Sequence, residues 1–365
     1  MAGQLRAYSF INAKLRARIG DLLEDTFFNQ LTRSASVDDA VASLAERGFA
    51  EVADAYRETG DIRVCEQVLY RNEVGLLLEV EQYLDAERRE FVAALADRYE
   101  VENIKTALRL WFEGVVRGKH VETKIAYLSR EPVHREIDLD GIVNASSPAD
   151  IAQVLTDTPY RDAVERTIEQ VQSAGSLFGV ERALDRDYFA RLLAQAKRLP
   201  APDRSAALSF IAVEADRENV SWIVRGMSYY GLSEQDALAG VLPGGSAFDK
   251  RVLREAMRSG RPTATLLEKL GQPGGAGGGA SAGGMGASGG SGRDSARQAK
   301  ELELVEAALE EETDRLVHKS LGSYPFTMGV VLSYYALSQR QLRRVAAVLN
   351  GLFYGLSAET VGAVL

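Results

Sequence analysis

Residues 101–115 read VENIKTALRLWFEGV, and this stretch decides the fold class. Its apolar side chains recur at steps of three and four residues, at Val101, Ile104, Leu108, Trp111 and Val115. That spacing places them in one stripe along a helix, so that the stripe faces a core. The stretch therefore predicts a long amphipathic helix.

The same period extends through most of the chain, and the strict alternation typical of strands is hard to find. Two helix starts agree with it, because Ser36 precedes a helical pattern and Ser147 is followed by Pro148, as at an N-cap with proline in the first helical position. The first pattern runs through Ala40, Leu44 and Phe49. An earlier stripe comprises Tyr8, Ile11, Leu15, Ile19 and Leu22. The predicted fold class is all-α.

Composition limits the function classes. The chain has 365 residues, of which 46% are hydrophobic, enough to build well-buried cores in two or three domains. No stretch approaches the 18 uninterrupted apolar residues of a membrane helix, and the first residues lack a signal-peptide pattern, so we expect a cytosolic protein. A net charge of −9 argues against nucleic acid as a partner and favours proteins.

One composition break interrupts the helical pattern. Residues 273–292 are almost entirely Gly, Ala and Ser, which cannot form a packed core, so we expect a flexible loop there. After it, a new stripe predicts a further helix, with Leu302, Val305, Leu309 and Leu316 on one side.

Internal repeats indicate a modular chain. One set, Ser36, Asp39, Leu44 and Phe49, recurs at a constant offset as Ser147, Asp150, Leu155 and Tyr160. A second set, Glu102-Asn103-Ile104 ending in Leu108-Arg109, recurs as Glu218-Asn219-Val220 ending in Val224-Arg225. A weaker third copy places Arg344-Val345 and Leu349-Asn350-Gly351 at the same positions.

These repeats predict three helical domains, at 1–119, 120–235 and 236–365, with the loop 273–292 inside the third. Chance similarity among helical stretches is the alternative explanation.

No motif predicts chemistry. Gly284 to Gly289 fits the dinucleotide fingerprint only in its letters, and Gly118-Lys119 lacks the rest of a phosphate-binding loop. The histidines His120, His134 and His318 lack the spacing of metal ligands on one helix. The single cysteine, Cys65, fits a core position. We therefore predict no catalytic residue, no cofactor-binding residue and no metal ligand.

Several polar groups remain as possible contact surfaces. The acidic run Glu310-Glu311-Glu312 with Asp314 is typical of a solvated helix face. Arginines at 340, 343 and 344 put positive charge near an apolar stripe, where they could meet an acidic partner. Two further groups share helix faces: Tyr8 with Asn12 and Arg16, and Asn103 with Lys105 and Arg109. Such residues more often satisfy neighbouring backbone groups than bind a ligand.

At these residues the chain resembles the C subunit of the archaeal and bacterial A/V-type rotary ATPases, known as the d subunit in the eukaryotic vacuolar enzyme. The resemblance is carried by Tyr8 to Arg18, Tyr99 to Arg109, Asp216 to Gly226, and Tyr324-Pro325-Phe326 leading to Gly355-Leu356-Ser357. Two features depart from it: Arg344 stands where the first two copies have Asn, and the glycine-rich insert has no counterpart that we associate with the family.

The resemblance implies three similar helical domains in a pseudo-threefold arrangement that forms a funnel. It also implies a non-catalytic part of the central stalk, peripheral to the cytoplasmic face of the membrane, which couples a rotating shaft made of the D and F subunits to the membrane proteolipid ring. No cofactor, metal or nucleotide belongs to such a component.

Two other function classes stay open. A helical-repeat scaffold would bind soluble protein partners, although solenoid repeats are much shorter than these modules. An all-α enzyme with an unfamiliar site would need a pocket with clustered ionisable groups.

Overall fold

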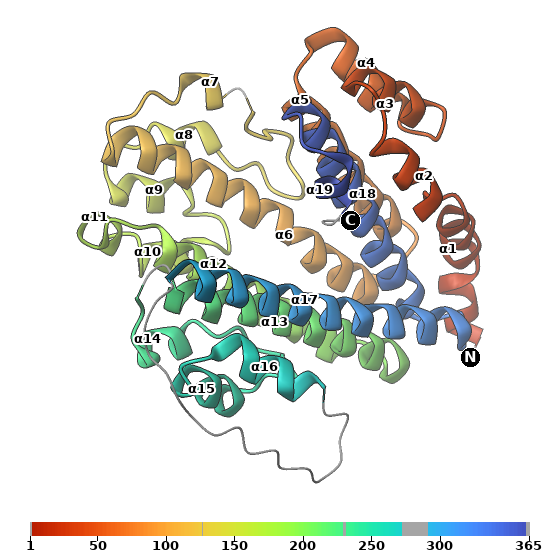
Figure 1. Ribbon diagram of the computed structural model, residues 1–365. Coiled ribbons are helices and arrows are strands. Elements are labelled where there is room, and N and C mark those ends of the chain that lie inside the picture. The colour runs from red at the N-terminus through yellow and green to blue at the C-terminus, as the bar shows by residue number, and fades with distance from the viewer. Residues whose placement is uncertain (1, 126, 229–230, 272–290, 363–365) are drawn as a thin grey trace. The chain divides into compact units, whose positions relative to one another are not determined.

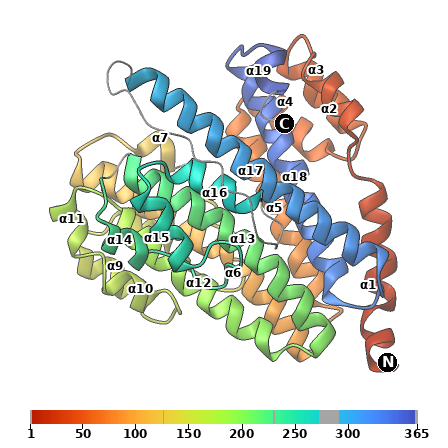
Figure 2. The same cartoon turned by 60° about the horizontal axis from the view of Figure 1, so that its bottom comes forward.

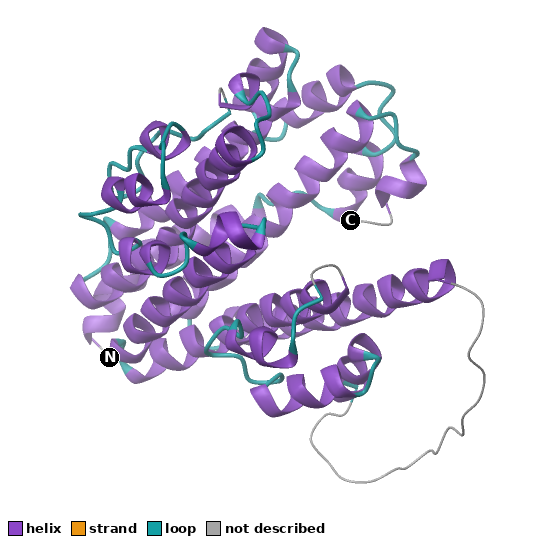
Figure 3. Cartoon of the chain, turned by 90° about the vertical axis from the view of Figure 1, so that its left-hand side faces the viewer, coloured by secondary structure: helices purple, strands orange, loops and turns teal. Residues whose placement is uncertain are grey.

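The computed structural model describes residues 2–125, 127–228, 231–271 and 291–362, and every regular element among them is helical (Figure 3). The expectation of an all-α fold is confirmed. The helices are α1 Ala2–Gly20, α2 Asp25–Leu31, α3 Val37–Ala45, α4 Ala50–Thr59, α5 Ile62–Glu81, α6 Ala86–Trp111, the π-helical turn η1 Phe112–Val116, α7 Glu122–Ile125, α8 Leu139–Val143, α9 Pro148–Val154, α10 Arg161–Glu165, α11 Gln170–Ala174, α12 Phe178–Arg198, α13 Ala201–Ser228, α14 Glu234–Ala239, α15 Lys250–Arg258, α16 Pro262–Leu270, α17 Ser291–Gly322, α18 Met328–Phe353 and α19 Ala358–Gly362.

The chain divides into two compact units. Unit 1 comprises Met1–Arg204 with Ser320–Leu365, and unit 2 comprises Ser205–Lys319. The division into three domains at 1–119, 120–235 and 236–365 stays a prediction. The expected loop 273–292 lies outside the described residues except for its last two, which begin α17.

One core of unit 1 is built from both ends of the chain. Helices α2 to α5 pack around buried residues that include Phe28, Leu44 and Cys65, and the second half of α18 fills the same core with Val345 and Val348. Helices α5 and α18 therefore lie side by side, far apart as they are along the sequence (Figure 1). The sequence predicted the pattern at Ala40 and Leu44 and an apolar stripe near Arg344, but not the pairing of α5 with α18.

Helix α6 is the long element of a second core in unit 1. It packs against α5, α8 and α12, and α12 runs beside it (Figure 2). The predicted stripe is confirmed at Val101, Ile104, Leu108 and Trp111, which are all buried. Val115 is 49% exposed because it lies in η1, where the wider π-helical turn rotates side chains away from the stripe.

Unit 2 has its own core. It combines the greater part of α13 with α14 to α17, and the expected stripe on α17 is confirmed at Val305 and Leu309, which are buried. The Trp222 ring lies directly against Gly240, where a Cβ atom would overlap it. The close approach of α13 and α14 therefore requires glycine at that position.

Both predicted N-caps are confirmed. The Ser36 side chain accepts a hydrogen bond from the Asp39 N–H, and Ser147 forms a capping box with Asp150. Phe49 is an exception to the predicted pattern, because α3 ends at Ala45 and Phe49 flanks the start of α4. In the part of the chain that the structure describes, no helix combines the length and the apolar character needed to cross a membrane.

Candidate functional site

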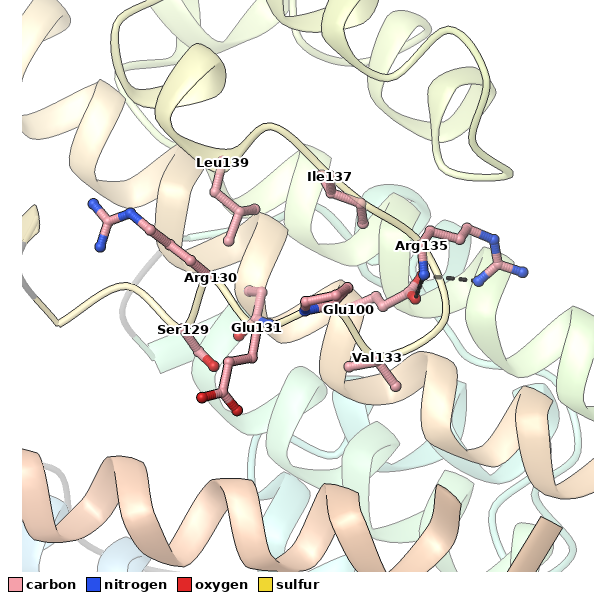
Figure 4. Close-up of a pocket in the computed structure, with 10 residues that line it drawn as sticks. Glu100, Ser129, Arg130, Glu131, Val133, Arg135, Ile137 and Leu139 are labelled. Atoms are coloured by element: carbon pink, nitrogen blue, oxygen red, sulfur yellow. Dashed lines mark hydrogen bonds and ion pairs between the residues drawn. The ribbon is translucent and has the colours of Figure 1, made fainter. Parts of the chain in front are cut away.

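The buried polar side chains gather where loops meet the long helices. On α6, the Glu100 side chain is 2% exposed, and its Oε1 accepts the backbone N–H groups of His134 and Arg135 at 2.8 and 2.9 Å. Its Oε2 accepts the Tyr160 hydroxyl at 2.7 Å and Arg135 Nη1 at 2.8 Å. Figure 4 shows Glu100 and Arg135 facing each other. Glu100 thus fixes the segment that leads into α8.

Asp97 lies one turn earlier on α6 and extends this cluster. Arg135 Nη1 donates to its Oδ1 at 2.7 Å, and Arg191 of α12 pairs with its Oδ2. His134 Nε2 lies 2.9 and 3.1 Å from the two carboxylate oxygens of Glu81. This hydrogen bond, reinforced by the nearby negative charges, raises the pKa of His134 despite its partial burial.

The same groups could in principle face a metal ion, since ligand atoms of Asp97, Glu100 and His134 lie within 4.8 Å of one another. However, the Arg135 guanidinium already bridges the two carboxylates, and Arg191 adds a second positive charge at Asp97. These cations supply the charge that a metal would bring. The geometry is therefore that of an ion-pair network.

A small pocket lies beside Glu100. Its lining includes Asn103, Arg130, Ile137 and Leu139 (Figure 4). The Arg130 guanidinium is held by both carboxylate oxygens of Asp140 at 2.8 Å. Arg130 and Arg135, the arginines that line the pocket, are therefore already paired with carboxylates. The pocket offers no convergent set of groups for a ligand.

Asp216 of α13 plays a corresponding part in unit 2. Its Oδ2 accepts the N–H groups of Ser246 and Ala247 at 2.9 and 2.8 Å, and its Oδ1 accepts that of Phe248 at 3.1 Å. A Cβ atom at Gly245 would overlap the carboxylate, so glycine lets the loop come this close. Burial raises the pKa of Asp216, and the three N–H donors oppose that effect.

Asn219, one turn later on α13, holds the start of the same loop. Its side-chain oxygen accepts the Leu242 N–H at 2.7 Å, and its Nδ2 donates to the Leu242 carbonyl at 3.1 Å. Asp216 and Asn219 together fix both ends of the loop 242–248 to one helix.

A further buried ion pair joins four helices in unit 1. Arg88 Nε donates to Asp203 Oδ2 at 2.8 Å and to the Tyr8 hydroxyl at 3.1 Å. Asp203 Oδ1 accepts the backbone N–H of Met328 at 2.8 Å. These residues come from α1, α6, the start of α13 and α18, and burial raises the pKa of Tyr8 well above its usual range. The pair thus ties together residues of four helices within unit 1.

In the folded chain, the members of the two polar groups predicted to share helix faces bind mostly different partners. Arg16 Nε donates to Asn12 at 3.0 Å as the spacing predicted, whereas Tyr8 turns inward to Arg88. The second group separates completely. Asn103 accepts from Tyr70 at 3.0 Å, Lys105 pairs with Asp185, and Arg109 pairs with Glu181 at 2.7 Å.

Two charged segments also acquire structural partners. Glu310, in the acidic run expected to be solvated, pairs with Arg217 at 2.7 Å inside unit 2. Arg344, at the position where the other copies carry Asn, pairs with Asp25 at 2.8 Å and lies over the Phe28 ring at 3.9 Å. It therefore keeps a polar role, through a different partner.

The remaining candidates have structural roles. Cys65 is fully buried as expected, and burial raises the pKa of its thiol to about 11. Gly118 has a φ of 65° in the turn that follows η1, which fits a helix end. His318 hydrogen-bonds the Asp314 carbonyl of its own helix. The stretch from Gly284 to Gly289 lies outside the described residues.

Sequence reasoning missed the network around Glu100 because its partners are far apart along the chain. His134 meets a carboxylate 53 positions away, and Arg135 meets two that are 38 and 35 positions away. The Ser-Pro and Glu-Asn patterns marked the helices, and no local spacing marked the loop that Glu100 holds.

Relatives that match almost the whole chain include three that are each named as the C subunit of an A-type ATP synthase. The protein of Methanocaldococcus jannaschii is 20% identical over 100% of this chain and 88% of its own length. That of Thermococcus kodakarensis is 22% identical over 97% of this chain and 89% of its own length. That of Halorubrum lacusprofundi is 23% identical over 96% of this chain and 95% of its own length.

Residues 11–364 match the family described as ATP synthase (C/AC39) subunit, which confirms the resemblance drawn from the sequence motifs. Members of that family are structural and not catalytic components, in agreement with the expectation that the chain is no enzyme by itself. Because the match extends over nearly every residue, this chain belongs to the C/AC39 family of the A/V-type ATP synthases.

Proposed function

We propose that this chain is the part of the central stalk that couples the rotating shaft to the membrane proteolipid ring. In this proposal it forms a socket for the D and F subunits of the shaft and sits on the cytoplasmic face of the membrane as a peripheral component. ATP hydrolysis or synthesis in the head is thereby linked to proton or sodium transport through the ring. The observation that carries the proposal is the family match over residues 11–364.

The buried junctions support a mechanical role. A coupler must pass torque without yielding, so its helices have to keep fixed angles. The ion pair of Arg88 with Asp203 and the network around Glu100 are both enclosed by protein and directional. Breaking such a pair leaves a buried charge with fewer partners, so alternative packings that separate the two groups are disfavoured. A rigid part fits torque transfer better than it fits recruitment of varied partners.

The proposal includes the arrangement of the chain. Three similar helical domains would stand in a pseudo-threefold arrangement and form a funnel that receives the foot of the shaft. The recurrence of capped helices after Ser36 and Ser147 supports a repeated module.

The direct test is an affinity pull-down of the tagged chain from detergent-solubilised membranes of its own source, followed by mass spectrometry. Recovery of the two shaft proteins together with the proteolipid is the expected result. Recovery of soluble proteins alone would overturn the coupler and favour the helical-repeat scaffold.

A functional test separates coupling from mere attachment. The complex, reconstituted in vesicles with and without this chain, is assayed for ATP hydrolysis and for ATP-driven ion uptake. We expect hydrolysis by the head to persist without the chain while ion uptake is lost, and uptake to return when the chain is added back. Ion uptake that is unchanged without the chain would contradict the proposal.

A further inference from the structure

The three sequence copies place one position of each long helix in register. With the offsets that align Asn103, Asn219 and Arg344, residue 100 of α6 corresponds to residue 216 of α13 and residue 341 of α18. Apolar residues at the following matched positions are buried in every copy: Ile104, Ala107 and Leu108; Val220, Ile223 and Val224; Val345, Val348 and Leu349. The register drawn from sequence is thus matched by burial.

At the matched position each helix carries a side-chain oxygen that accepts backbone N–H groups from a loop. Glu100 accepts those of residues 134 and 135, and Asp216 accepts those of residues 246, 247 and 248. Gln341 Oε1 accepts the Leu23 N–H at 2.6 Å. Carboxylate and carboxamide oxygens share this acceptor role, so the chemistry is retained although the residue changes.

Each of the three loops then ends at an acidic N-cap residue that opens the next helix. Glu24 precedes α2, Asp138 precedes α8 and Asp249 precedes α15. The held N–H groups lie shortly before these caps in every copy. A further helix start follows each of these short helices, namely α3, α9 and α16. Acceptor, loop, acidic cap and second helix therefore follow the same order three times.

We propose that Glu100, Asp216 and Gln341 are equivalent anchor residues, one in each of three modules, and that α18 completes the first module. The first module then comprises α2 to α5 with the second half of α18 and with α19. The second comprises the second half of α6 with α8 to α12, and the third coincides with unit 2. This inference rests on the three-domain part of the proposed function and assigns the last helices to the first module instead of the third.

The packing of each module supports this assignment. Val345, Val348 and Leu349 of α18 share one core with Phe28 and Leu44. Their counterparts on α6 lie in the region that packs against α8 and α12. If the last helices belonged to a third module with residues 236–319, their buried stripe would face that segment, and instead it faces α2 to α5.

Three natural reporters make the inference testable. The single cysteine, Cys65, lies in the core of the first module, and the two tryptophans lie in the other modules, Trp111 in the second and Trp222 in the third. Thiol labelling in low denaturant follows Cys65, and fluorescence in single-tryptophan backgrounds made with Trp→Phe follows each of the other two.

The variants are Gln341→Met, Glu100→Gln and Asp216→Asn in the full purified chain. Gln341→Met removes the acceptor at similar volume, and losing one partly buried hydrogen bond corresponds to up to about tenfold in an opening equilibrium. We therefore expect Cys65 labelling to accelerate by up to about tenfold, while the transitions at Trp111 and Trp222 stay unchanged. Gln341→Glu keeps an acceptor oxygen and is expected to restore slow labelling. Glu100→Gln should shift the Trp111 transition more than the other two reporters, and Asp216→Asn should do the same for the Trp222 transition.

The outcomes separate cleanly. A Gln341→Met chain that labels at the original rate, or one that changes the Trp222 transition and not Cys65, would overturn the assignment. Equal responses of all three reporters to every variant would also overturn it, because they would indicate one cooperative body without modules. Gln341 is partly exposed, so its variant is the mildest and keeps the test valid even if Asp216→Asn fails to fold. The test uses the isolated chain, so its failure is distinct from a failed pull-down.

Discussion

The Glu100 and Asp216 anchors both hold a loop, but the charges around the two carboxylates differ. Both carboxylates are almost fully buried, at 2% and 1% exposed, and both accept N–H groups of the loop that follows. Glu100 also receives the Arg135 guanidinium at 2.8 Å. Within the described part of the chain, the partners of Asp216 are the neutral N–H groups of Ser246 to Phe248 and the Ser246 side chain.

The difference shows two ways of burying a carboxylate. At Glu100 an opposite charge offsets the loss of water, so removing the negative charge takes from Arg135 one of its two carboxylate partners and leaves Asp97 as the other. At Asp216 the partners among the described residues are dipoles, and burial prevails over them, because the pKa of Asp216 is raised. Both helices therefore carry a hydrogen-bond acceptor at the matched position, and the residues of the surrounding loop decide whether a negative charge on it is favourable.

The largest effect is expected from removing each acceptor. Glu100→Ala and Asp216→Ala each leave two or more N–H groups that are at least partly buried without their acceptor, so each should lower the free energy of unfolding by about 3 kcal/mol. Urea unfolding, followed at Trp111 for the first variant and at Trp222 for the second, measures this. Exposed carboxylates on the same units provide controls: Glu90→Ala and Glu306→Ala should stay within about 0.5 kcal/mol. A loss under about 1 kcal/mol at either anchor would show that the loop does not depend on it.

A smaller effect separates the two anchors. Glu100→Gln keeps the shape and removes the charge that Arg135 faces, so we expect a loss of about 2 kcal/mol. Asp216→Asn loses part of its acceptor capacity and is relieved of a buried charge, so the net loss should be about 1 kcal/mol. The same two fluorescence titrations measure both. If the Asn variant proved the more damaging of the pair, the electrostatic contrast would be wrong.

The loop held by Glu100 should also respond to pH near neutrality. The pKa of His134 is raised in the folded state, so its stabilising contribution is complete below the unfolded pKa of about 6.5 and is lost as pH rises through the folded value. We expect unit 1 to lose less than about 1 kcal/mol from this cause over that interval, because His134 is partly exposed.

His134→Gln should flatten this dependence when the Trp111 transition is measured from about pH 6 to about pH 8.5. His318→Gln serves as the matched control, since His318 bonds only a carbonyl of its own helix among the contacts described. If the pH dependence of stability persisted in the His134 variant and disappeared in the His318 variant, His134 would not be the group that titrates.

The smallest effect is the pH response of Asp216. A raised carboxyl pKa means that the folded state holds the proton more tightly than the unfolded state, so this contribution falls as pH rises from about 4 through the folded value. The difference in stability between the wild-type chain and Asp216→Asn should therefore shrink by a few tenths of a kcal/mol over that window. The Trp222 transition measures it, and a difference that grows with pH would mean that the N–H donors outweigh burial.

Much of the local structure could be predicted from the sequence. The stripes at Tyr8, Ile11 and Leu15 and at Val101, Ile104 and Leu108 are buried, and the caps at Ser36 and Ser147 form as expected. These features depend on residues within one or two helical turns, so their physical cause is contained in a short window. Three of the segments that carry the family resemblance, Tyr8 to Arg18, Tyr99 to Arg109 and Asp216 to Gly226, lie on α1, α6 and α13, and the others flank α18.

The anchors could be predicted only in part. The repeated Glu-Asn segment marked the helices that carry Glu100 and Asp216, and both residues fall within segments that carry the family resemblance, although nothing in their spacing indicated that they hold loops. The sequence offered even less indication of Gln341, because the third copy has Arg343 and Arg344 at the positions of Glu102 and Asn103. A side chain that accepts an N–H from a loop leaves no fixed spacing, because loop lengths differ between copies.

By itself, the sequence determined that this protein is all-α, that helices begin after Ser36 and Ser147, which face several helices bury and to which family the chain belongs, since each of these follows from local periodicity or ordered motifs. Only the tertiary structure decided which helices share a core, as when α18 joins α2 to α5, and which charges meet, as when Arg88 meets Asp203. The reason is physical. Apolar burial is non-directional and specifies a face without naming its partner, whereas a buried charge is satisfied only by the group that the fold brings to it.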